Sequence, residues 1–331
     1  EILILVTEKG IDRNYSVKNS SKRDINFMIS ELRRSMNDVN QLFAYKESLE
    51  LYNILIRPIK NIIKNKETIY LYGSGLENLP FGVLISDYNK AVEISEYQRL
   101  VSSDWLIKHH SFARIFPLSN NKINSSFENK FLGFANPSSL EELGLPILPN
   151  SEIEIRDLSL ATGDFDKKFL LTKNNASKKN LKIKLEDSFE RIVFATHSVP
   201  AGWKGLTTES ALVLDDKNGD FLLTATEIVD LDIKSDIIVL SSCNTDQKGS
   251  DSLYKSFLIA GANSVMYSNW DLETLSAAVI TDKVFKSILY EASPKHQALQ
   301  KASISIMNDY SNKSYAHPAF WGNFSIAYRN L

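Results

Sequence analysis

The chain has 331 residues, of which 43% are hydrophobic and 24% charged, and its formal net charge is −2. This length and composition are typical of one large or two ordinary globular domains. The balanced charge gives no broad electrostatic basis for binding nucleic acid or an anionic membrane, and no apolar run approaches the ~20 residues that a membrane helix needs.

The first residues do not form a signal peptide, because a basic start and a small-residue cleavage site are both missing. Since the chain does not begin with methionine, we expect it to be part of a longer polypeptide with upstream modules. A single cysteine, Cys243, excludes a disulfide framework within the chain and fits a reducing compartment. We therefore expect a cytoplasmic protein.

The first part of the chain predicts a mixture of strands and helices. Residues 1–17 predict two short strands around Lys9-Gly10. Apolar side chains at helical spacing predict helix over residues 23–64, with a kink or end at Pro58. Buried strands are expected at residues 68–72 and 130–135. The segment 118–129 is rich in Asn and Ser and predicts a surface connection.

The second part alternates strands and helices from residue 191 onward, which favours a right-handed α/β sheet. The basic segment 172–184 predicts the start of a solvated helix rather than a basic patch. The remaining expected elements are a hairpin around residues 215–220, a helix over 251–260 stopped by Gly261, a strand over 263–267, two helices of which the second is N-capped by Ser293, and a closing strand.

Two apolar runs end on residues that can react. One run ends at His197, and the other, 46 residues later, ends at Cys243. Both predict buried strands. Side chains at the carboxyl ends of neighbouring parallel strands converge in one crevice, where an imidazole could take the thiol proton. The backbone N–H groups of Ser198 and Cys243 could then stabilise an oxyanion.

The alternative is that Cys243 is an inert core residue, which is common for cysteine. The other histidines are weaker candidates for chemistry: His296 is expected on a helix surface, and His317 is expected to anchor a turn. One cysteine without a His-x-x-x-His pair gives no zinc site, and Gly73-Ser74-Gly75 lacks the remaining signature of a phosphate loop. We expect neither a metal nor a cofactor.

The order of several motifs resembles the CHAT peptidases, which belong with caspases and separases to one clan of cysteine proteases. Caspases also place the histidine ~50 residues before the cysteine. The matching segments run in continuous order from residue ~70 to 331: Gly75-Leu76 with Leu79-Pro80-Phe81, Phe194-Ala195-Thr196-His197, Gly219 to Ile228, Ser242-Cys243-Asn244-Thr245, Ala260 to Val265 with Trp270, and His317-Pro318-Ala319-Phe320-Trp321.

The resemblance implies a caspase-like three-layer α-β-α fold with an N-terminal pseudo-caspase part over residues 1–145 and a catalytic part over residues 146–331. It implies a cysteine endopeptidase, with His197 as the base and Cys243 as the nucleophile. It also implies a protein substrate and a role in bacterial defence. The loop 246–251 is short and offers little room for a long internal cleavage segment, so we expect activation by a partner or upstream module. Asp271 or Glu273 could favour a basic residue before the cut, although both could equally cap a helix.

Two positions depart from the family pattern. Ser198 and Asp246 stand where relatives usually have glycine. A serine can still donate its N–H, but the conformational freedom of glycine is lost. A second hypothesis follows, in which the chain is a catalytically silent pseudo-protease that binds a peptide in the same crevice.

Overall fold

The computed structural model describes residues 2–8, 11–17, 21–72, 76, 79–118, 126–161, 165–241, 250–270 and 274–330. Its strands are β1 (Ile2–Glu8), β2 (Ile11–Val17), β3 (Thr68–Leu71), β4 (Ser111–Ile115), β5 (Lys130–Ala135), β6 (Lys167–Thr172), β7 (Phe189–Ala195), β8 (Ser198–Val199), β9 (Ala211–Val213), β10 (Leu222–Thr224), β11 (Ser235–Leu240), β12 (Ser264–Ser268) and β13 (Phe324–Tyr328). Its α-helices are α1 (Lys22–Asn37), α2 (Tyr45–Leu55), α3 (Lys60–Ile63), α4 (Glu96–Ser102), α5 (Ser139–Glu142), α6 (Pro149–Ala161), α7 (Lys178–Lys184), α8 (Ala225–Val229), α9 (Ser250–Ala260), α10 (Thr274–Glu291), α11 (Lys295–Met307) and α12 (Pro318–Trp321).

Eight of the described strands form one sheet in the order β3-β4-β13-β12-β11-β7-β5-β6. Neighbouring strands are parallel except for β12 and β13, which are antiparallel. The strands β12, β11, β7, β5 and β6 therefore end at one edge of the sheet, and β3, β4 and β13 end at the opposite edge. The loops that follow β7, β11 and β12 all leave from the same edge.

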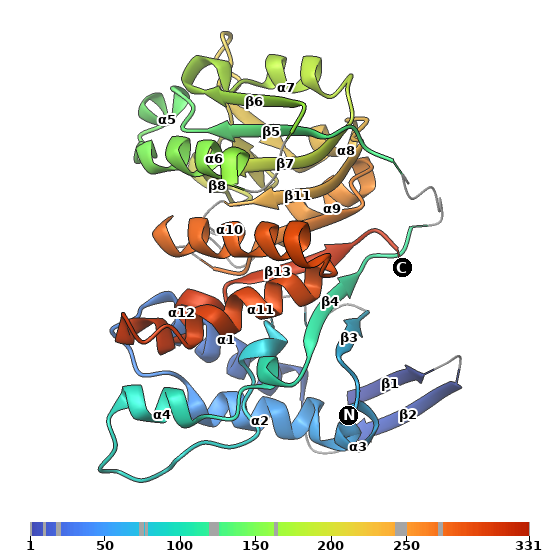
Figure 1. Cartoon of the computed structure of the whole chain (residues 1–331), viewed down its shortest axis with the longest axis vertical. Coiled ribbons are helices and arrows are strands. Elements are labelled where there is room, and N and C mark those ends of the chain that lie inside the picture. The colour runs from blue at the N-terminus through green and yellow to red at the C-terminus, as the bar shows by residue number, and fades with distance from the viewer. Residues whose placement is uncertain are drawn as a thin grey trace.

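Helices cover both faces of this sheet, so the molecule has three layers (Figure 1). Alternate side chains of β7 and β11 enter different cores, as the period of two in a strand requires. Val193 and Val239 pack into the core that also includes residues of α1, α2, α6, α10 and α11. Phe194 and Leu240 pack into the opposite core, which includes residues of α7 and α9. The α/β architecture with a layered, mostly parallel sheet is thus confirmed.

Two small sheets accompany the large one. β8, β9 and β10 form an antiparallel sheet directly after β7, and β1 and β2 form a separate hairpin. In the described part of the chain, no helix combines the length and apolar character needed to cross a bilayer.

Most of the expected elements are confirmed, including the helix break around Pro58, where a 3-10 turn over Arg57–Ile59 follows α2. The expected cap of α11 is wrong. Pro294 is the N-cap residue, with no side-chain cap bond. The Ser293 hydroxyl instead bonds Ser287 and the Lys301 ammonium, so it does not satisfy a helix N–H group.

The expected division at residues 1–145 and 146–331 does not coincide with a gap in the sheet. β5 lies before residue 146 but pairs with β6 and β7, and β13 pairs with β4. The division into a pseudo-caspase part and a catalytic part stays a prediction.

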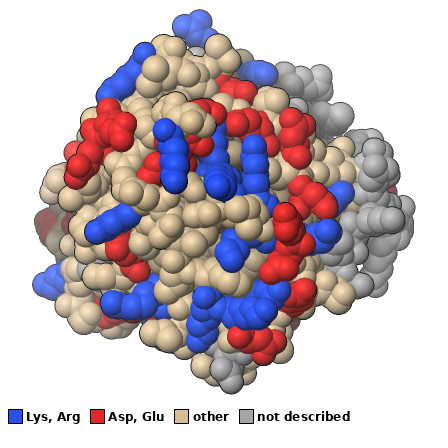
Figure 2. Space-filling view, turned by 90° about the horizontal axis from the view of Figure 1, so that it is seen from above, with Lys and Arg blue, Asp and Glu red and all other residues tan. Residues whose placement is uncertain are grey.

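The basic segment 172–184 contributes α7 rather than a positive patch. Lys178, at the start of α7, is buried and forms ion pairs of 2.8 Å with Asp220 and 2.9 Å with Glu227. Lys184 lies over the ring of Phe169. Basic and acidic side chains are interspersed on the face of the molecule that Figure 2 shows.

Candidate active site

His197 follows the buried strand β7, at the edge where the central parallel strands end. The run that forms β7 has alternating apolar residues that satisfy both cores, so the strand is fixed in register and its end is fixed with it. The Thr196 hydroxyl donates to the Val213 carbonyl at 2.8 Å, and the Val213 N–H donates to the His197 carbonyl at 2.9 Å. The backbone on either side of the imidazole is therefore held by β9.

The imidazole of His197 is bound by a backbone carbonyl. Nε2 lies 2.9 Å from the Pro146 carbonyl oxygen, which can only accept a hydrogen bond. Nε2 must therefore carry the proton in the neutral ring, and Nδ1 has the free lone pair. Burial lowers the pKa of His197 below its ordinary value, and the Pro146 carbonyl partly opposes this shift by favouring the charged ring. The ring is thus a neutral base near pH 7.

Asn136 holds the loop that carries Pro146. Its Oδ1 accepts the Leu148 N–H at 2.8 Å, and its Nδ2 donates to Glu152 at 2.6 Å. Its φ of 45° is in the left-handed region, which asparagine tolerates better than most residues. No feature of the sequence marks Pro146 or Asn136, because any residue supplies a carbonyl and asparagine is frequent throughout the chain.

Ser198 has an extended backbone rather than a left-handed one: it belongs to β8 and is not among the described residues with positive φ. It pairs with Leu212, and the ladder bond runs from the Val213 N–H to the His197 carbonyl. This is the geometry of a non-hydrogen-bonded pair, in which the N–H of Ser198 points away from β9. The backbone here does not need glycine, and the oxyanion role of Ser198 stays a prediction.

Three of the predicted site residues, Cys243, Asp271 and Glu273, lie outside the described residues. The described register still constrains the first of them. Leu240 on β11 pairs with Phe194 on β7, an offset of 46 positions. His197 and Cys243 differ by the same 46 positions. In the sequence, each residue therefore stands three positions after one member of the register pair Phe194 and Leu240.

Glu154 is a buried acid on the same side of the sheet, and the sequence analysis missed it. Glu154 lies in α6 and is 5% exposed. The Ser241 hydroxyl, directly after β11, donates to its carboxyl group, and burial raises the pKa of Glu154 to about 7. α6 packs closely against β5 because Gly133 of β5 has no side chain. A Cβ atom at that position would lie 2.9 Å from the Cβ atom of Ile155.

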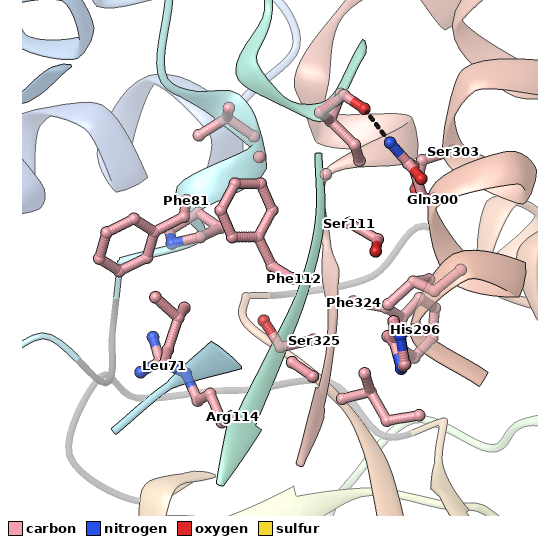
Figure 3. A pocket seen from close by; sticks show the side chains of 18 of the residues that line it. Leu71, Phe81, Ser111, Phe112, Arg114, His296, Gln300, Ser303, Phe324 and Ser325 are labelled. Atoms are coloured by element: carbon pink, nitrogen blue, oxygen red, sulfur yellow. Dashed lines mark hydrogen bonds between the residues drawn. The ribbon is translucent and has the colours of Figure 1, made fainter. Parts of the chain in front are cut away.

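A cavity of about 50 Å³ lies elsewhere, between β4, β13 and α11. Figure 3 shows its labelled side chains, including Arg114, whose guanidinium donates to the carbonyls of Leu76 and Leu79. Neither His197 nor Glu154 lines it. The Leu79-Pro80-Phe81 element belongs to the wall of this cavity.

Two of the other histidines, His317 and His296, form hydrogen bonds within the fold. His317 is the N-cap of α12 and accepts the Ala319 N–H at 3.2 Å, so its turn-anchoring role is confirmed. The expectation that His296 lies on a helix surface is wrong. Its ring is turned toward the sheet and lies 3.0 Å from the Tyr328 hydroxyl. The described ranges contain no group of three or more His, Cys, Asp or Glu side chains placed to hold a metal ion.

The model of the CHAT domain matches residues 46–330, which is most of the chain. The chain belongs to the CHAT domain family. The matched region begins within α2 and includes every described strand of the large sheet.

Solved structures with partial similarity include two classes of cysteine protease. The Arg-specific cysteine proteinase gingipain R is 10% identical with a TM-score of 0.47, covering 93% of this chain and 73% of that chain. The Porphyromonas gingivalis RgpB pro- and mature domains are 12% identical with a TM-score of 0.44, covering 93% and 76%. The Saccharomyces cerevisiae separase–securin complex is 12% identical with a TM-score of 0.40, and the match covers 66% of this chain but only 14% of that chain. No curated protein matches the chain.

Proposed function

We propose that this CHAT domain is a cysteine endopeptidase in which Cys243 is the nucleophile and His197 is the general base. The observation that carries the proposal is that the Pro146 carbonyl fixes the imidazole of His197 through its Nε2 atom. His197 itself lies just beyond the carboxyl end of β7. Its basic Nδ1 atom has the lone pair that can take a proton, and Cys243 follows Leu240 by three positions in the sequence, as His197 follows Phe194, the register partner of Leu240; both facts support the proposal.

The reaction follows from these assignments. Nδ1 takes the thiol proton, and the thiolate attacks the carbonyl carbon of the scissile bond. The N–H groups of Ser198 and Cys243 would stabilise the oxyanion. The tetrahedral intermediate collapses to a thioester as the imidazolium returns its proton to the leaving amine. A water molecule, deprotonated by His197, then hydrolyses the thioester and restores the thiol.

The Pro146 carbonyl contributes twice. It keeps the proton on Nε2, which sets the tautomer, and it stabilises the imidazolium that forms during the attack. The lowered pKa of His197 keeps the ring unprotonated and able to act as a base at neutral pH. We further propose that a partner or upstream module turns the activity on, in a cytoplasmic defence system. Cleavage of the chain within residues 246–252 during activation would count against that part.

The first test uses the single cysteine. A peptide with an electrophilic carboxyl-terminal group should label the wild-type chain at Cys243, and His197→Gln should slow the labelling by at least ~100-fold because the base is lost. Cys243→Ala should abolish both labelling and cleavage while the circular dichroism spectrum stays unchanged. His296→Gln is the matched control, since His296 bonds only within the fold, and should label at the wild-type rate.

The pseudo-protease hypothesis predicts the opposite result. Under it, Cys243 in the wild-type chain reacts no faster than in His197→Gln, with or without candidate upstream modules. Ser198 motivated this hypothesis, but its extended backbone removes the conformational argument against catalysis. Ser198→Gly should therefore change the labelling rate by less than about threefold.

A further inference from the structure

Side chains bind both ends of the segment that carries Pro146. Asn136 binds its far end, where the Leu148 N–H donates to Oδ1. Lys204 binds its near end, where the ammonium donates to the Leu143 carbonyl at 2.7 Å. Pro146 lies between these two points and is itself exposed. Burial of its own ring therefore does not fix the direction of its carbonyl, and the two side chains do.

Lys204 also closes a ring of connections that begins and ends at His197. From His197 the chain continues through β8 into the loop 200–207, which contains Lys204. The Lys204 ammonium bonds the Leu143 carbonyl, and three residues further on, the Pro146 carbonyl accepts Nε2–H of His197. A shift of Pro146 away from the imidazole therefore strains the bond that Lys204 makes.

The backbone of Lys204 is in an unfavourable conformation. Its φ is 48° and its ψ is 17°, which is the left-handed region that a lysine rarely adopts. Among the described residues other than glycine, four have a positive φ, and two of these are Asn136 and Lys204. Backbone strain persists only where the surrounding contacts enforce it, and it is typical of functional sites. The two residues that bind the Pro146 segment thus share a feature that is rare in the chain.

The contacts of the Lys204 side chain explain why its backbone is kept in this conformation. The ammonium lies 4.8 Å from the centre of the Trp203 ring. Trp203, Leu143 and Leu145 pack against the same small core beneath β8 and β9. Leu143 is the C-cap residue of α5, and lysine side chains commonly bond the last carbonyls of a helix. A charged donor also makes a stronger hydrogen bond than a neutral one. The ammonium therefore joins the loop after β8 to the segment that follows α5.

We propose that Lys204 is a positioning residue for the general base. Its ammonium holds Leu143, so that the Pro146 carbonyl stays on Nε2 of His197 and the neutral ring keeps its proton there. The effect on catalysis rests on the proposed function, whereas the position of the imidazole can be measured without it.

The first test follows the imidazole by NMR. In the wild-type chain at pH 8, the Nε2–H proton of His197 should exchange slowly with water, because it is hydrogen-bonded and the ring is buried. Lys204→Met keeps the aliphatic stem but lacks the ammonium, and it should accelerate this exchange at least about tenfold. Lys204→Arg supplies other cationic donors and should bring the exchange to within about threefold of wild type.

Lys204→Gly separates positioning from stability. Glycine adopts the left-handed backbone without strain but has no ammonium. The variant should therefore unfold at a higher urea concentration than Lys204→Met, yet its His197 proton should exchange just as fast. Slow exchange in Lys204→Gly would overturn the proposal, because the ammonium would then not be needed.

Lys173→Met is the matched control. Lys173 is an exposed lysine with a φ of 51°, and within the described residues its side chain forms no hydrogen bond or ion pair. The control should show the wild-type exchange rate. Slow exchange that persists in Lys204→Met, or equal acceleration in Lys173→Met, would contradict the positioning role.

Labelling of Cys243 by the electrophilic peptide separates this inference from the protease proposal. If both are correct, Lys204→Met should label about three- to tenfold more slowly, and Lys204→Arg should label close to the wild-type rate. Accelerated imidazole exchange in Lys204→Met, without His197-dependent labelling of the wild-type chain, supports the positioning role and rejects the endopeptidase. Unchanged exchange together with His197-dependent labelling rejects the positioning role and leaves the endopeptidase standing.

Discussion

A single backbone carbonyl sets the chemistry of His197, and Asn136 is the residue that holds this carbonyl in place. Asn136→Ala removes two hydrogen bonds, to Leu148 and Glu152, and places an alanine at a φ of 45°. We expect cleavage to show a kcat lower by about 10- to 100-fold with KM changed much less, because the tautomer of the base is no longer fixed.

Asn136→Gly separates the two effects of that substitution. Glycine adopts the left-handed backbone freely but has no side-chain amide. It should restore part of the stability lost in Asn136→Ala but none of the kcat. If the glycine variant regains wild-type kcat, the amide does not act through Pro146.

The buried acid gives the chain a pH-dependent stability. The pKa of Glu154 is raised in the folded state from 4.5 to about 7. The folded chain therefore binds more protons than the unfolded chain between these values, and stability is lost as pH rises through 7. Glu154→Gln should increase the free energy of unfolding by up to about 3 kcal/mol at pH 8 and should change it little at pH 4.5.

Urea unfolding at the two pH values measures this difference, with Asp157→Asn as the control that should show no such pH dependence. A Glu154→Gln variant that is less stable than wild type at pH 8 would mean that the carboxylate has a partner in the folded chain. In that case the carboxyl oxygen Oε1, which has no hydrogen-bond partner among the described residues, is satisfied by another group.

At the scale of elements, the turn from α9 into β12 depends on Gly261. Its φ is 126°, and a Cβ atom there would lie 2.2 Å from the Ile233 carbonyl oxygen. Gly261→Ala combines backbone strain with a clash against a rigid backbone atom, so we expect a loss of at least about 2 kcal/mol in the free energy of unfolding.

Gly219→Ala is the comparison for that experiment. Gly219 also has a positive φ, of 80°, but nothing lies within 4 Å of its Cβ position. It reports the backbone strain alone, which should cost about 1–2 kcal/mol. Equal losses in the two variants would show that the helix end moves away from Ile233 without penalty.

The elements that sequence reasoning found are those whose buried faces are apolar. Runs such as Ile192–Ala195 and Ile237–Leu240 are buried on both faces, and β5 was predicted with its observed limits, Lys130–Ala135. α6 was missed because its pattern is partly inverted. Ser151, Glu154 and Ser159 are buried, whereas Ile153 and Leu160 are exposed. The apolar residues of this helix therefore do not recur with the period of 3.6 residues that predicts a helix.

The same criterion, an apolar pattern beside the residue, separates the site residues that the sequence predicts from those that it does not. His197 could be predicted because an apolar strand leads directly to it. Glu154 belongs to the missed helix, and Pro146 acts only through its backbone, so neither residue has a pattern that marks it. The positions Cys243, Asp271 and Glu273 stay predictions, since they lie outside the described ranges.

At the scale of the whole molecule, α1, which lies outside the matched CHAT region, contacts the edge of the sheet where β7, β11 and β12 end. Arg33 is buried, and its guanidinium donates to the Asn269 carbonyl, just after β12. The N–H groups of Asn269 and Trp270 are bound by the Asn323 side chain at 3.0 and 3.2 Å. Two segments that are distant in the chain therefore hold the backbone at residues 269 and 270, directly before Asp271 in the sequence.

Arg33→Met should loosen that junction. We expect amide hydrogen exchange at residues 268–270 to become at least about tenfold faster, because the buried carbonyl loses its donor. Arg34→Met is the control, since Arg34 is exposed and pairs with Glu31 on its own helix. Unchanged exchange in Arg33→Met would mean that Arg33 is not needed to hold the backbone at residues 268–270.

The position of β13 has a consequence for how the chain is made. This strand, Phe324–Tyr328, lies between β4 and β12 and pairs with both. β3 and β4 precede it by more than two hundred positions in the chain, and among the described strands only β13 pairs them with the rest of the large sheet. During translation, neither β4 nor β12 can complete its pairing with β13 until residue 328 has left the ribosome. β13 is the last of the described strands in chain order, so a ribosome that stalls before residue 324 leaves β4 and β12 each with an unpaired edge, which favours aggregation.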